Sequence, residues 1–212
     1  THPDLMDNIW VNEKEKNGVP GVDDDGNGYV DDVYGWKFVS AGEEAPFHGQ
    51  LGSPDPLDDN GHGTHVAGTI GATGGNGGGV AGINWNVRIM GLKFLDSSGS
   101  GSLSAAIDAI DYMVAMKRKG VNVRVANNSW GGGAYSSSLA RAIQRARDAG
   151  IVFVAAAGNE ANDNDASQSY PANYEFDNVI SVAAIDQNQS LASCSNFGAS
   201  TVGIAAPGVD IL

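Results

Sequence analysis

The sequence predicts one α/β domain with a mostly parallel central sheet and helices on both of its faces, a three-layer arrangement. Apolar segments of strand length alternate along most of the chain with segments of helical periodicity. Strands that alternate with helices are joined by right-handed crossovers, and they therefore run parallel. The 212 residues are enough to bury one sizeable core. In such a sheet, functional residues gather at the carboxyl ends of the strands.

The composition narrows the classes of function. A formal net charge of −13 argues against nucleic-acid binding, which needs clustered lysine and arginine. It suits either a highly soluble protein or one that collects cations, and calcium is the cation to expect. No apolar run approaches the roughly 18 residues of a membrane span, and no basic and apolar leader opens the chain. The single cysteine, Cys194, cannot form an internal disulfide. We therefore expect neither a nucleic acid nor a membrane as a partner.

The first part of the chain differs in character from the rest. Residues 1–60 are polar and rich in glycine, proline and aspartate, which predicts long surface loops with one short strand near Val33–Val39. We expect this part to bind calcium and residues 61–212 to form the α/β core of the same domain. A helix over His62–Thr73 opens the core. The near-continuous apolar run of Val87–Phe94 then fits a strand that is buried on both faces.

The later elements follow from the same periodicities. Ser102 is expected to cap a helix that ends at Gly120, and a second helix is expected over Ser138–Ala149, before Gly150. One apolar face is formed by Leu103, Ala106, Ile107, Ile110 and Val114 in the first helix, and by Leu139, Ala142, Ile143 and Ala146 in the second. Strands are predicted at Val121–Ala126, Ile151–Ala156, Val179–Ala184 and Val202–Ala206.

Residues 59–68 are the most informative segment of the chain. Gly61 and Gly63 flank His62 at the start of a predicted helix, and residues without a Cβ let a backbone or a substrate approach the imidazole. Histidine titrates near neutral pH, as a general base must. Two other interpretations remain open on these residues alone. His62 and His65 are spaced to form half of a metal site, or His65 is a buried structural histidine.

A second segment, Ala155–Glu160, follows the apolar strand predicted at Ile151–Ala156. The carboxamide of Asn159 can donate an N–H to an oxyanion as it forms at a scissile carbonyl. The alternative is an asparagine selected for its turn propensity, because Gly-Asn pairs are common in loops. The position after a strand of the sheet favours the catalytic interpretation.

The string from Gly61 to Gly68 resembles the histidine signature of the subtilisin-like serine proteases, the subtilase or peptidase S8 family, in its bacterial thermitase-like and subtilisin-like branch. The resemblance implies a subtilisin-like fold, with His62 as the catalytic base and His65 as a structural residue. Ala155–Glu160 resembles the oxyanion segment of the family, with Asn159 as the donor. The implied reaction is endopeptidase cleavage of polypeptides through an acyl-enzyme by a secreted protein with a prodomain.

The resemblance extends to residues that bind substrate. Asn127–Gly132 resembles the substrate-binding segment of the family, with the Ser100–Ser102 loop across the cleft, and both would offer backbone groups to an extended peptide. The residues implied in this role are Ser100, Gly101, Ser102, Ser129, Trp130 and Gly131, with Ala156, Ala157 and Gly158 as walls of the S1 pocket and Glu160 and Ser169 at its rim and base. Each Gly/Ser run, taken alone, is more typical of a plain loop, and only its occurrence together with the histidine and asparagine motifs favours the substrate-binding interpretation.

Two motifs of the family do not occur in these 212 residues. They are the Gly-Thr-Ser-Met-Ala string of the nucleophile and the Asp-Thr-Gly or Asp-Ser-Gly string of the triad aspartate. Thr1–Leu5 resembles the stretch after the aspartate motif, and Ala206–Ile211 resembles the stretch before the serine motif. We therefore expect a fold that is incomplete at both ends and a chain without proteolytic activity of its own. The alternative is a pseudo-protease that serves as a peptide-binding or scaffold module.

An acidic loop predicts the first calcium site. Residues 23–32 alternate oxygen-bearing side chains with glycines, as a hard cation with six to eight ligands requires. The expected ligands are Asp23, Asp25, Asn27, the Tyr29 carbonyl and Asp32. Tyr34 stands where an EF-hand has its glutamate, so the loop is not an EF-hand. The alternative is a solvated acidic turn.

A glycine-rich loop predicts the second calcium site. Residues 73–80 resemble the high-affinity calcium loop of the family. The implied ligands are the Asn76 side chain, the carbonyls of Thr73, Gly78 and Val80, and the carboxylate of Asp4. Lys37 stands where thermitase-like proteins have an aspartate at a third ion, which speaks against that third site.

Overall fold

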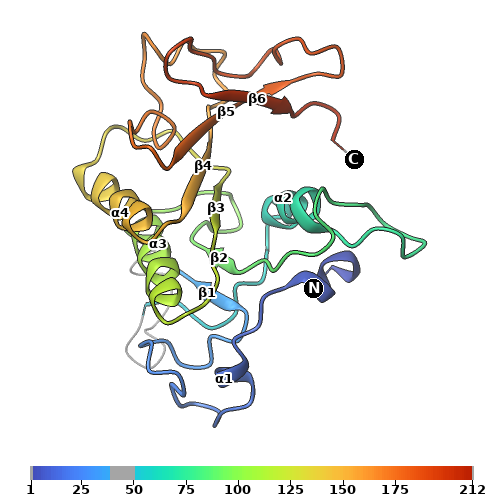
Figure 1. Cartoon of the computed structure of the whole chain (residues 1–212), viewed down its shortest axis with the longest axis vertical. Coiled ribbons are helices and arrows are strands. Elements are labelled where there is room, and N and C mark those ends of the chain that lie inside the picture. The colour runs from blue at the N-terminus through green and yellow to red at the C-terminus, as the bar shows by residue number, and fades with distance from the viewer. Residues whose placement is uncertain (1, 39–50, 212) are drawn as a thin grey trace. The chain divides into compact units, whose positions relative to one another are not determined.

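The computed structural model describes residues 2–38 and 51–211 (Figure 1). It divides into two compact units, Thr1–Ala109 and Ile110–Leu212. Within the described residues, no helix is both long and apolar enough to cross a membrane.

The first unit holds a two-stranded parallel sheet and short helices. Its elements are η1 (Pro3–Asn8), α1 (Glu13–Lys16), β1 (Gly35–Lys37), α2 (His62–Gly71) and β2 (Gly91–Lys93). Gly35 pairs with Gly91 and has φ +116°, and a Cβ built on it would lie 1.9 Å from the Gly91 carbonyl oxygen. Only glycine allows the two strands to approach this closely. Trp36, the next residue of β1, pairs with Leu92 and is fully buried.

Both strands of this unit are shorter than the sequence predicts. β1 covers the middle of the predicted Val33–Val39 strand, and Val39 lies outside the described residues. The predicted Val87–Phe94 strand is divided between two partners, because Ile89 bridges Ile9 whereas Gly91–Lys93 pairs with β1. All three residues of β2 are partly exposed, so the expected burial on both faces is not observed.

The second unit contains a four-stranded parallel sheet. Its strands, in the order β3-β4-β5-β6, are β3 (Val125–Asn128), β4 (Val152–Ala156), β5 (Val179–Ile185) and β6 (Ile204–Pro207). The bounds of β4, β5 and β6 differ from the predicted bounds by two residues at most. The strands therefore form two parallel sheets within the described residues, rather than one.

β3 begins four residues later than the sequence predicts, because the preceding residues close the helix before them. α3 (Leu103–Arg118) ends before Gly120, and the N–H of Val121 then donates to the carbonyl of Met116 at 3.1 Å. Lys117 Nζ donates to the Val123 carbonyl at 2.6 Å. The backbone of this apolar segment is thus used in a turn and does not join the sheet.

The predicted helices are present. Ser102 Oγ accepts a hydrogen bond from the N–H of Ala105 at 3.1 Å, which confirms it as the cap of α3. α4 (Ser137–Asp148) is capped by Ser136 and packs against β4. All four apolar residues predicted for one face of α4 are buried: Leu139, Ala142, Ile143 and Ala146. Arg145 on α4 holds Asp111 on α3 by two hydrogen bonds of 2.7 and 2.8 Å.

Ile143 provides a test of this packing. The side chain is completely buried at the contact of α4 with β4. We expect Ile143→Ala to lower the free energy of unfolding by about 2–5 kcal/mol, because the side chain leaves a cavity in the core. Urea denaturation measures the change. Arg141→Ala, on the exposed face of the same helix, is the control, and an equal loss in both variants would contradict the packing described.

Candidate active site and calcium sites

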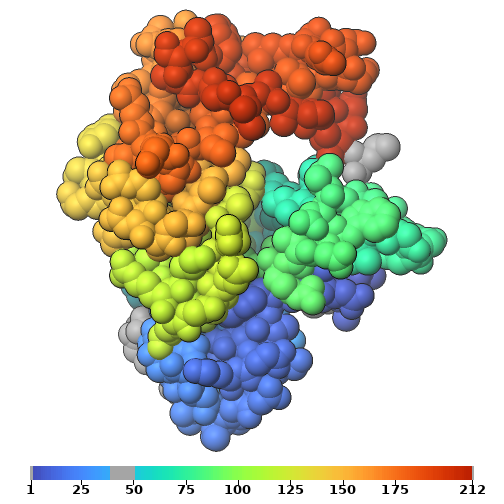
Figure 2. Space-filling model, in the orientation of Figure 1, coloured from blue at the N-terminus to red at the C-terminus, as the bar shows by residue number. Residues whose placement is uncertain are grey.

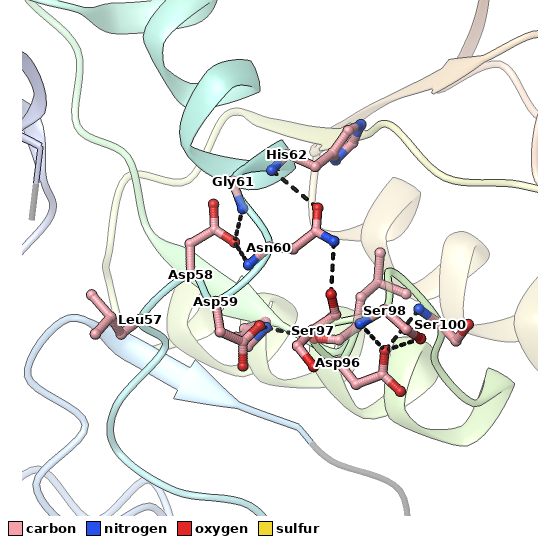
Figure 3. A network of polar contacts seen from close by, with 12 residues as sticks. Leu57, Asp58, Asp59, Asn60, Gly61, His62, Asp96, Ser97, Ser98 and Ser100 are labelled. Atoms are coloured by element: carbon pink, nitrogen blue, oxygen red, sulfur yellow. Dashed lines mark hydrogen bonds and ion pairs between the residues drawn. The ribbon is translucent and has the colours of Figure 1, made fainter.

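His62 is the first residue of α2, and the residue before it cannot cap the helix with a side chain. Gly61 is the N-cap, with φ +98°. Asp58 supplies the cap instead (Figure 3). Its carboxylate accepts hydrogen bonds from the N–H groups of Asn60, Gly61 and Thr64 at 3.0, 3.0 and 2.8 Å, and from the Thr64 hydroxyl at 2.7 Å. The start of α2 is therefore fixed by a residue outside the helix.

The same hydrogen bonds set the charge of Asp58. Partial burial raises the pKa of this carboxyl, but the bonds from Thr64, Gly61 and Asn60 stabilise the ionised form and lower the pKa by more. The net pKa lies well below the usual value. A negative charge is thus held beside the N-terminus of α2, where the helix dipole favours it.

Asn60 connects the start of α2 to the predicted substrate loop. Its Oδ1 accepts a hydrogen bond from His62 N–H at 3.3 Å, and its Nδ2 donates to the Ser97 carbonyl at 2.9 Å. A second link is the ion pair between Lys93 Nζ and Asp59 at 2.7 Å. Figure 3 shows the His62 ring directed away from this network. His62 is therefore exposed, while its backbone N–H is bonded to Asn60.

The loop that contains Ser100–Ser102 is itself a tight turn. Asp96 accepts hydrogen bonds from the hydroxyl of Ser98 and from the N–H groups of Ser98 and Ser100, and these bonds lower the pKa of its carboxyl. The N–H of Asp96 also donates to the Ser100 carbonyl at 2.8 Å. Both backbone groups of Ser100 are therefore used within the turn. Gly101 is exposed, and a Cβ there would lie 2.4 Å from the Phe94 carbonyl oxygen.

The second unit carries the predicted oxyanion donor just after β4. Ala157 is buried and Asn159 is exposed, and between them Gly158 has φ +123°. A Cβ on Gly158 would lie 2.2 Å from Asn196 Nδ2, so this position requires glycine. The N–H of Asn159 donates to Glu160 Oε2 at 2.9 Å.

The predicted substrate segments of this unit meet at one edge of the sheet. Asn128 pairs with Ala155 in the parallel register of β3 and β4, so the segments after the two strands lie at the same edge. These segments contain Ser129, Trp130 and Gly131 on one side, and Ala156, Ala157, Gly158 and Glu160 on the other. Ser169 lies next to Tyr170, which forms a β-bridge with Gly133 in the segment after β3. The N–H of Ser169 donates to Asn173 Oδ1 at 2.9 Å.

The acidic loop forms a compact carboxylate group, with one member that the sequence analysis missed. Glu15, Asp25 and Asp32 bring oxygen atoms within 4.8 Å of one another. Asn27 reaches the same group, because its Nδ2 donates to Asp32 at 2.7 Å. Asp23 is placed differently, since its carboxylate accepts the N–H groups of Gly26, Asn27 and Gly28 and so shapes the turn. Tyr29 packs its ring against Trp36 at 5.0 Å.

The predicted second calcium loop closes over a buried carboxylate. Asp4 accepts hydrogen bonds from Asn76 Nδ2 at 3.1 Å and Val80 N–H at 2.9 Å, and its carbonyl accepts the N–H of Thr73 at 2.8 Å. The bond from Val80, then that from Asn76, lowers the pKa of Asp4. Gly78 N–H donates to Asn76 Oδ1 at 3.3 Å. This loop follows α2 and projects at the right of Figures 1 and 2.

The acidic loop suits calcium by the chemistry of its donors. Its three carboxylates gather beside the carboxamide of Asn27, and such oxygens are the ligands that a hard cation prefers. In the second loop, Thr73 Oγ1 is buried and accepts or donates no hydrogen bond among the described residues. Burial of such a group is costly unless another partner is present. The carboxylates of the acidic loop therefore fit Ca²⁺, whereas Ca²⁺ at the second loop stays a prediction.

Comparison with known proteins identifies the family. Residues 1–211 match Peptidase S8, the subtilase family. The chain belongs to this family. Subtilisin-like protease 1 of Plasmodium vivax is 36% identical over 227 residues, which cover 99% of this chain and 34% of that protein. A thermophilic serine proteinase of Bacillus sp. (strain AK1) is 45% identical over 159 residues, which cover 74% of this chain and 37% of that protein.

A solved structure supports the fold of this subtilase. The crystal structure of a cold adapted subtilisin-like serine proteinase matches with a TM-score of 0.65 and 38% identity, over 76% of this chain and 53% of that chain. The parallel sheets and helices thus belong to the three-layer α/β fold that the sequence predicts. The chain spans about a third of the length of the curated relatives named above.

Two residues of this subtilase were not found from the sequence, although each left a signal there. Glu15 lies in the Asn12–Lys16 segment ahead of the acidic loop. The sequence does not show that the chain folds back and brings its carboxylate to Asp25 and Asp32. Asp58 stands three residues before Gly61, a distance at which a carboxylate can reach back to a helix start whose N-cap has no side chain. Both act across loops, and periodicity does not describe loops.

Asp58 gives a pH-dependent prediction. The folded pKa lies below the unfolded value of about 3.9, so the carboxylate adds stability above that pH and loses it as the pH falls through the folded pKa. We expect Asp58→Asn to lower the melting temperature at neutral pH and to differ less from the wild type below about pH 4. Asp55→Asn, a nearby exposed aspartate, is the control. A difference that stays constant across the pH range would contradict the capping role.

Proposed function

We propose that this chain forms the core of a serine endopeptidase that cleaves polypeptides through an acyl-enzyme, with His62 as general base and Asn159 as oxyanion donor. One observation carries the proposal. An exposed imidazole stands at a helix start whose backbone is fixed by Asp58 and Asn60, in a chain of the subtilase family. Fixed geometry with an accessible ring is what proton transfer to and from a substrate requires.

The chemistry of acyl transfer assigns His62 two proton transfers. The imidazole takes the proton of an attacking serine hydroxyl as the tetrahedral intermediate forms, and it gives that proton to the leaving amine as the peptide bond breaks. The serine and the aspartate that orients the imidazole are assigned to a longer protein, because neither motif occurs in these 212 residues. The proposal includes that these 212 residues alone are inactive, since a triad acts as a unit.

Asn159 would act at the oxygen of the scissile carbonyl. Negative charge develops there in the tetrahedral intermediate, and a donor that is already in place stabilises it without reorganisation. The exposed position of Asn159 just after β4 supports this role, because its backbone is bonded through Glu160 while its side chain faces solvent.

Substrate binding is assigned to accessible backbone segments, each of which can pair with an extended peptide. Ser129–Gly131 follows β3, and Gly101 and Ser102 follow the Asp96 turn; both are accessible segments that can pair with a strand. Ala156, Ala157 and Gly158 would line the S1 pocket, with Ser169 near its base. Glu160 would stand at the rim, although one carboxylate oxygen already bonds within the turn.

The remaining parts of the proposal concern calcium and cellular context. Ca²⁺ would have a structural role, bound by Glu15, Asp25 and Asp32 with Asn27, and by Asp4 with the Thr73–Val80 loop. When bound, it would neutralise the carboxylates and join the loops that contribute them. The family resemblance further supports a secreted protein with a prodomain. A pseudo-protease that only binds peptides is the second candidate, favoured by the absence of both triad strings from this sequence.

A fluorophosphonate probe tests the assignment of His62. The full-length protein should react covalently at its serine, and His62→Ala should abolish labelling because the hydroxyl is no longer deprotonated. His65→Ala, one turn along the same helix, is the matched control and should retain labelling. Labelling that persists in His62→Ala would exclude it as the base, and absence of labelling in the wild type would favour the pseudo-protease. An equal loss in both variants would support a metal site instead.

Thermal melts test the calcium assignment. Calcium at about 100 times its Kd should stabilise the protein by about 2.7 kcal/mol, and EDTA should remove this gain. Glu15→Gln should reduce the calcium-dependent shift in melting temperature, because it removes a buried carboxylate from the acidic group. Glu13→Gln, an exposed residue on the same short helix, should leave the shift intact. A melting temperature indifferent to EDTA would exclude calcium binding.

A further inference from the structure

We propose that Asn196 is a positioning residue for the oxyanion donor: its side chain holds the backbone on both sides of Asn159 and thereby fixes where that donor stands. This inference rests on the proposed function of Asn159. Asn196 is itself outside the family motifs discussed above, and only 1% of its surface is exposed. It lies in the loop between β5 and β6, which is far in sequence from the turn that it contacts.

The carboxamide of Asn196 bonds to both sides of the turn. Its Oδ1 accepts the N–H groups of Glu160 and Asn162 at 2.8 and 3.1 Å, which lie after Asn159. Its Nδ2 donates to the Ala157 carbonyl at 3.1 Å, which lies before Asn159. The backbone N–H of Asn196 also donates to the Gly158 carbonyl at 3.0 Å. One residue therefore fixes peptide groups on both sides of the donor.

The chemistry of the surroundings leaves the carboxamide a single orientation. Two N–H donors face Oδ1, whereas three oxygens face Nδ2, those of Ala157, Glu160 Oε2 at 2.9 Å and Asn164 Oδ1 at 3.1 Å. A rotated carboxamide would set donor against donor and acceptor against acceptor. Asn164 is completely buried, and it also donates to the Ala157 carbonyl, at 2.9 Å.

Glu160 completes the arrangement from the other side. Its Oε2 accepts the N–H of Asn159 and the Nδ2 of Asn196, both at 2.9 Å. The turn at Gly158 packs so closely on these two side chains that a Cβ would lie 2.2 Å from Asn196 Nδ2 and 2.6 Å from Glu160 Oε2. A donor set in a rigid frame needs no reorganisation when the oxyanion forms, which is the condition for large rate effects.

Steady-state kinetics of the full-length protein with a peptide anilide test the inference. Asn196→Ala should lower kcat by about tenfold to 10²-fold with little change in KM, because the donor is misplaced while the substrate cleft remains. Asn178→Ala is the matched control. Asn178 bonds the Ile151 carbonyl at 3.1 Å, just before β4 and at the opposite end of that strand from the turn, and its loss should leave kcat unchanged.

A double-mutant cycle shows whether Asn196 acts through Asn159. Asn159→Ala alone should lower kcat by about 10²–10³-fold, the size of effect known for the oxyanion asparagine of a subtilisin. Adding Asn196→Ala should then cost less than about twofold more, because no donor is left to position. Independent, multiplicative losses would overturn the inference. An unchanged kcat in Asn159→Ala would instead reject the proposed oxyanion role, and the inference with it.

Two further measurements separate positioning from folding. Hydrogen exchange of residues 157–162 should become faster in Asn196→Ala while β5 keeps its protection, and unchanged exchange would contradict the contacts. Asn196→Asp keeps the side-chain volume and the oxygen that accepts from Glu160 and Asn162, but it replaces the donor to Glu160 by a second carboxylate oxygen. The two carboxylates repel each other, so kcat should again fall. Adding Glu160→Gln supplies a donor and should restore part of that loss. Full activity in both folded Asn196 variants would overturn the inference and leave the function of Asn159 intact.

Discussion

The parallel pairing of β3 with β4 is the constraint on which the placement of the proposed peptide-binding segments of the second unit depends. Because the two strands run in the same direction with Asn128 opposite Ala155, the segments that follow them emerge at one edge. Ser129–Gly131 and Ala157–Glu160 are thus neighbours although the 25 residues 132–156, including α4, separate them in the chain. α4 packs its buried face against β4, the strand from which the second segment emerges. Core packing and site geometry are therefore coupled in this unit.

Carboxylates and carboxamides organise the loops where no helix or strand does so. Asp58 orders the start of α2, Asp96 closes the turn before α3, and Asp4 gathers the Thr73–Val80 loop. Each of these carboxylates accepts at least one backbone N–H and one side-chain donor, so the acidic composition is used for loop structure. The lowered pKa values of these carboxyls follow from the same bonds. Some of the carboxylates behind the net charge of −13 therefore stabilise the loops in which they lie.

The sequence predicted what periodicity and motifs encode. The apolar face of α4 and the strands β4 and β5 follow from apolar spacing and length, and the histidine and asparagine motifs identified the family. Contacts between distant loops were not predictable. Glu15 and Asn196 are unremarkable in sequence, and their roles depend on how the chain returns to the acidic loop and to the turn after β4. β3 began late because Lys117 and Val121 close α3, a local competition that apolar character alone does not show.

The central proposal is that His62 acts as the general base and Asn159 as the oxyanion donor of acyl transfer in the full-length protein. A crystal structure of the full-length protein inhibited by a peptidyl phosphonate tests this claim most directly, because the phosphonyl oxygen mimics the oxyanion on the nucleophile. The account predicts that this oxygen accepts a hydrogen bond of about 2.7–3.1 Å from Asn159 Nδ2, with the His62 imidazole beside the modified serine. A phosphonyl oxygen bound by other donors, with Asn159 or His62 turned away, would contradict it.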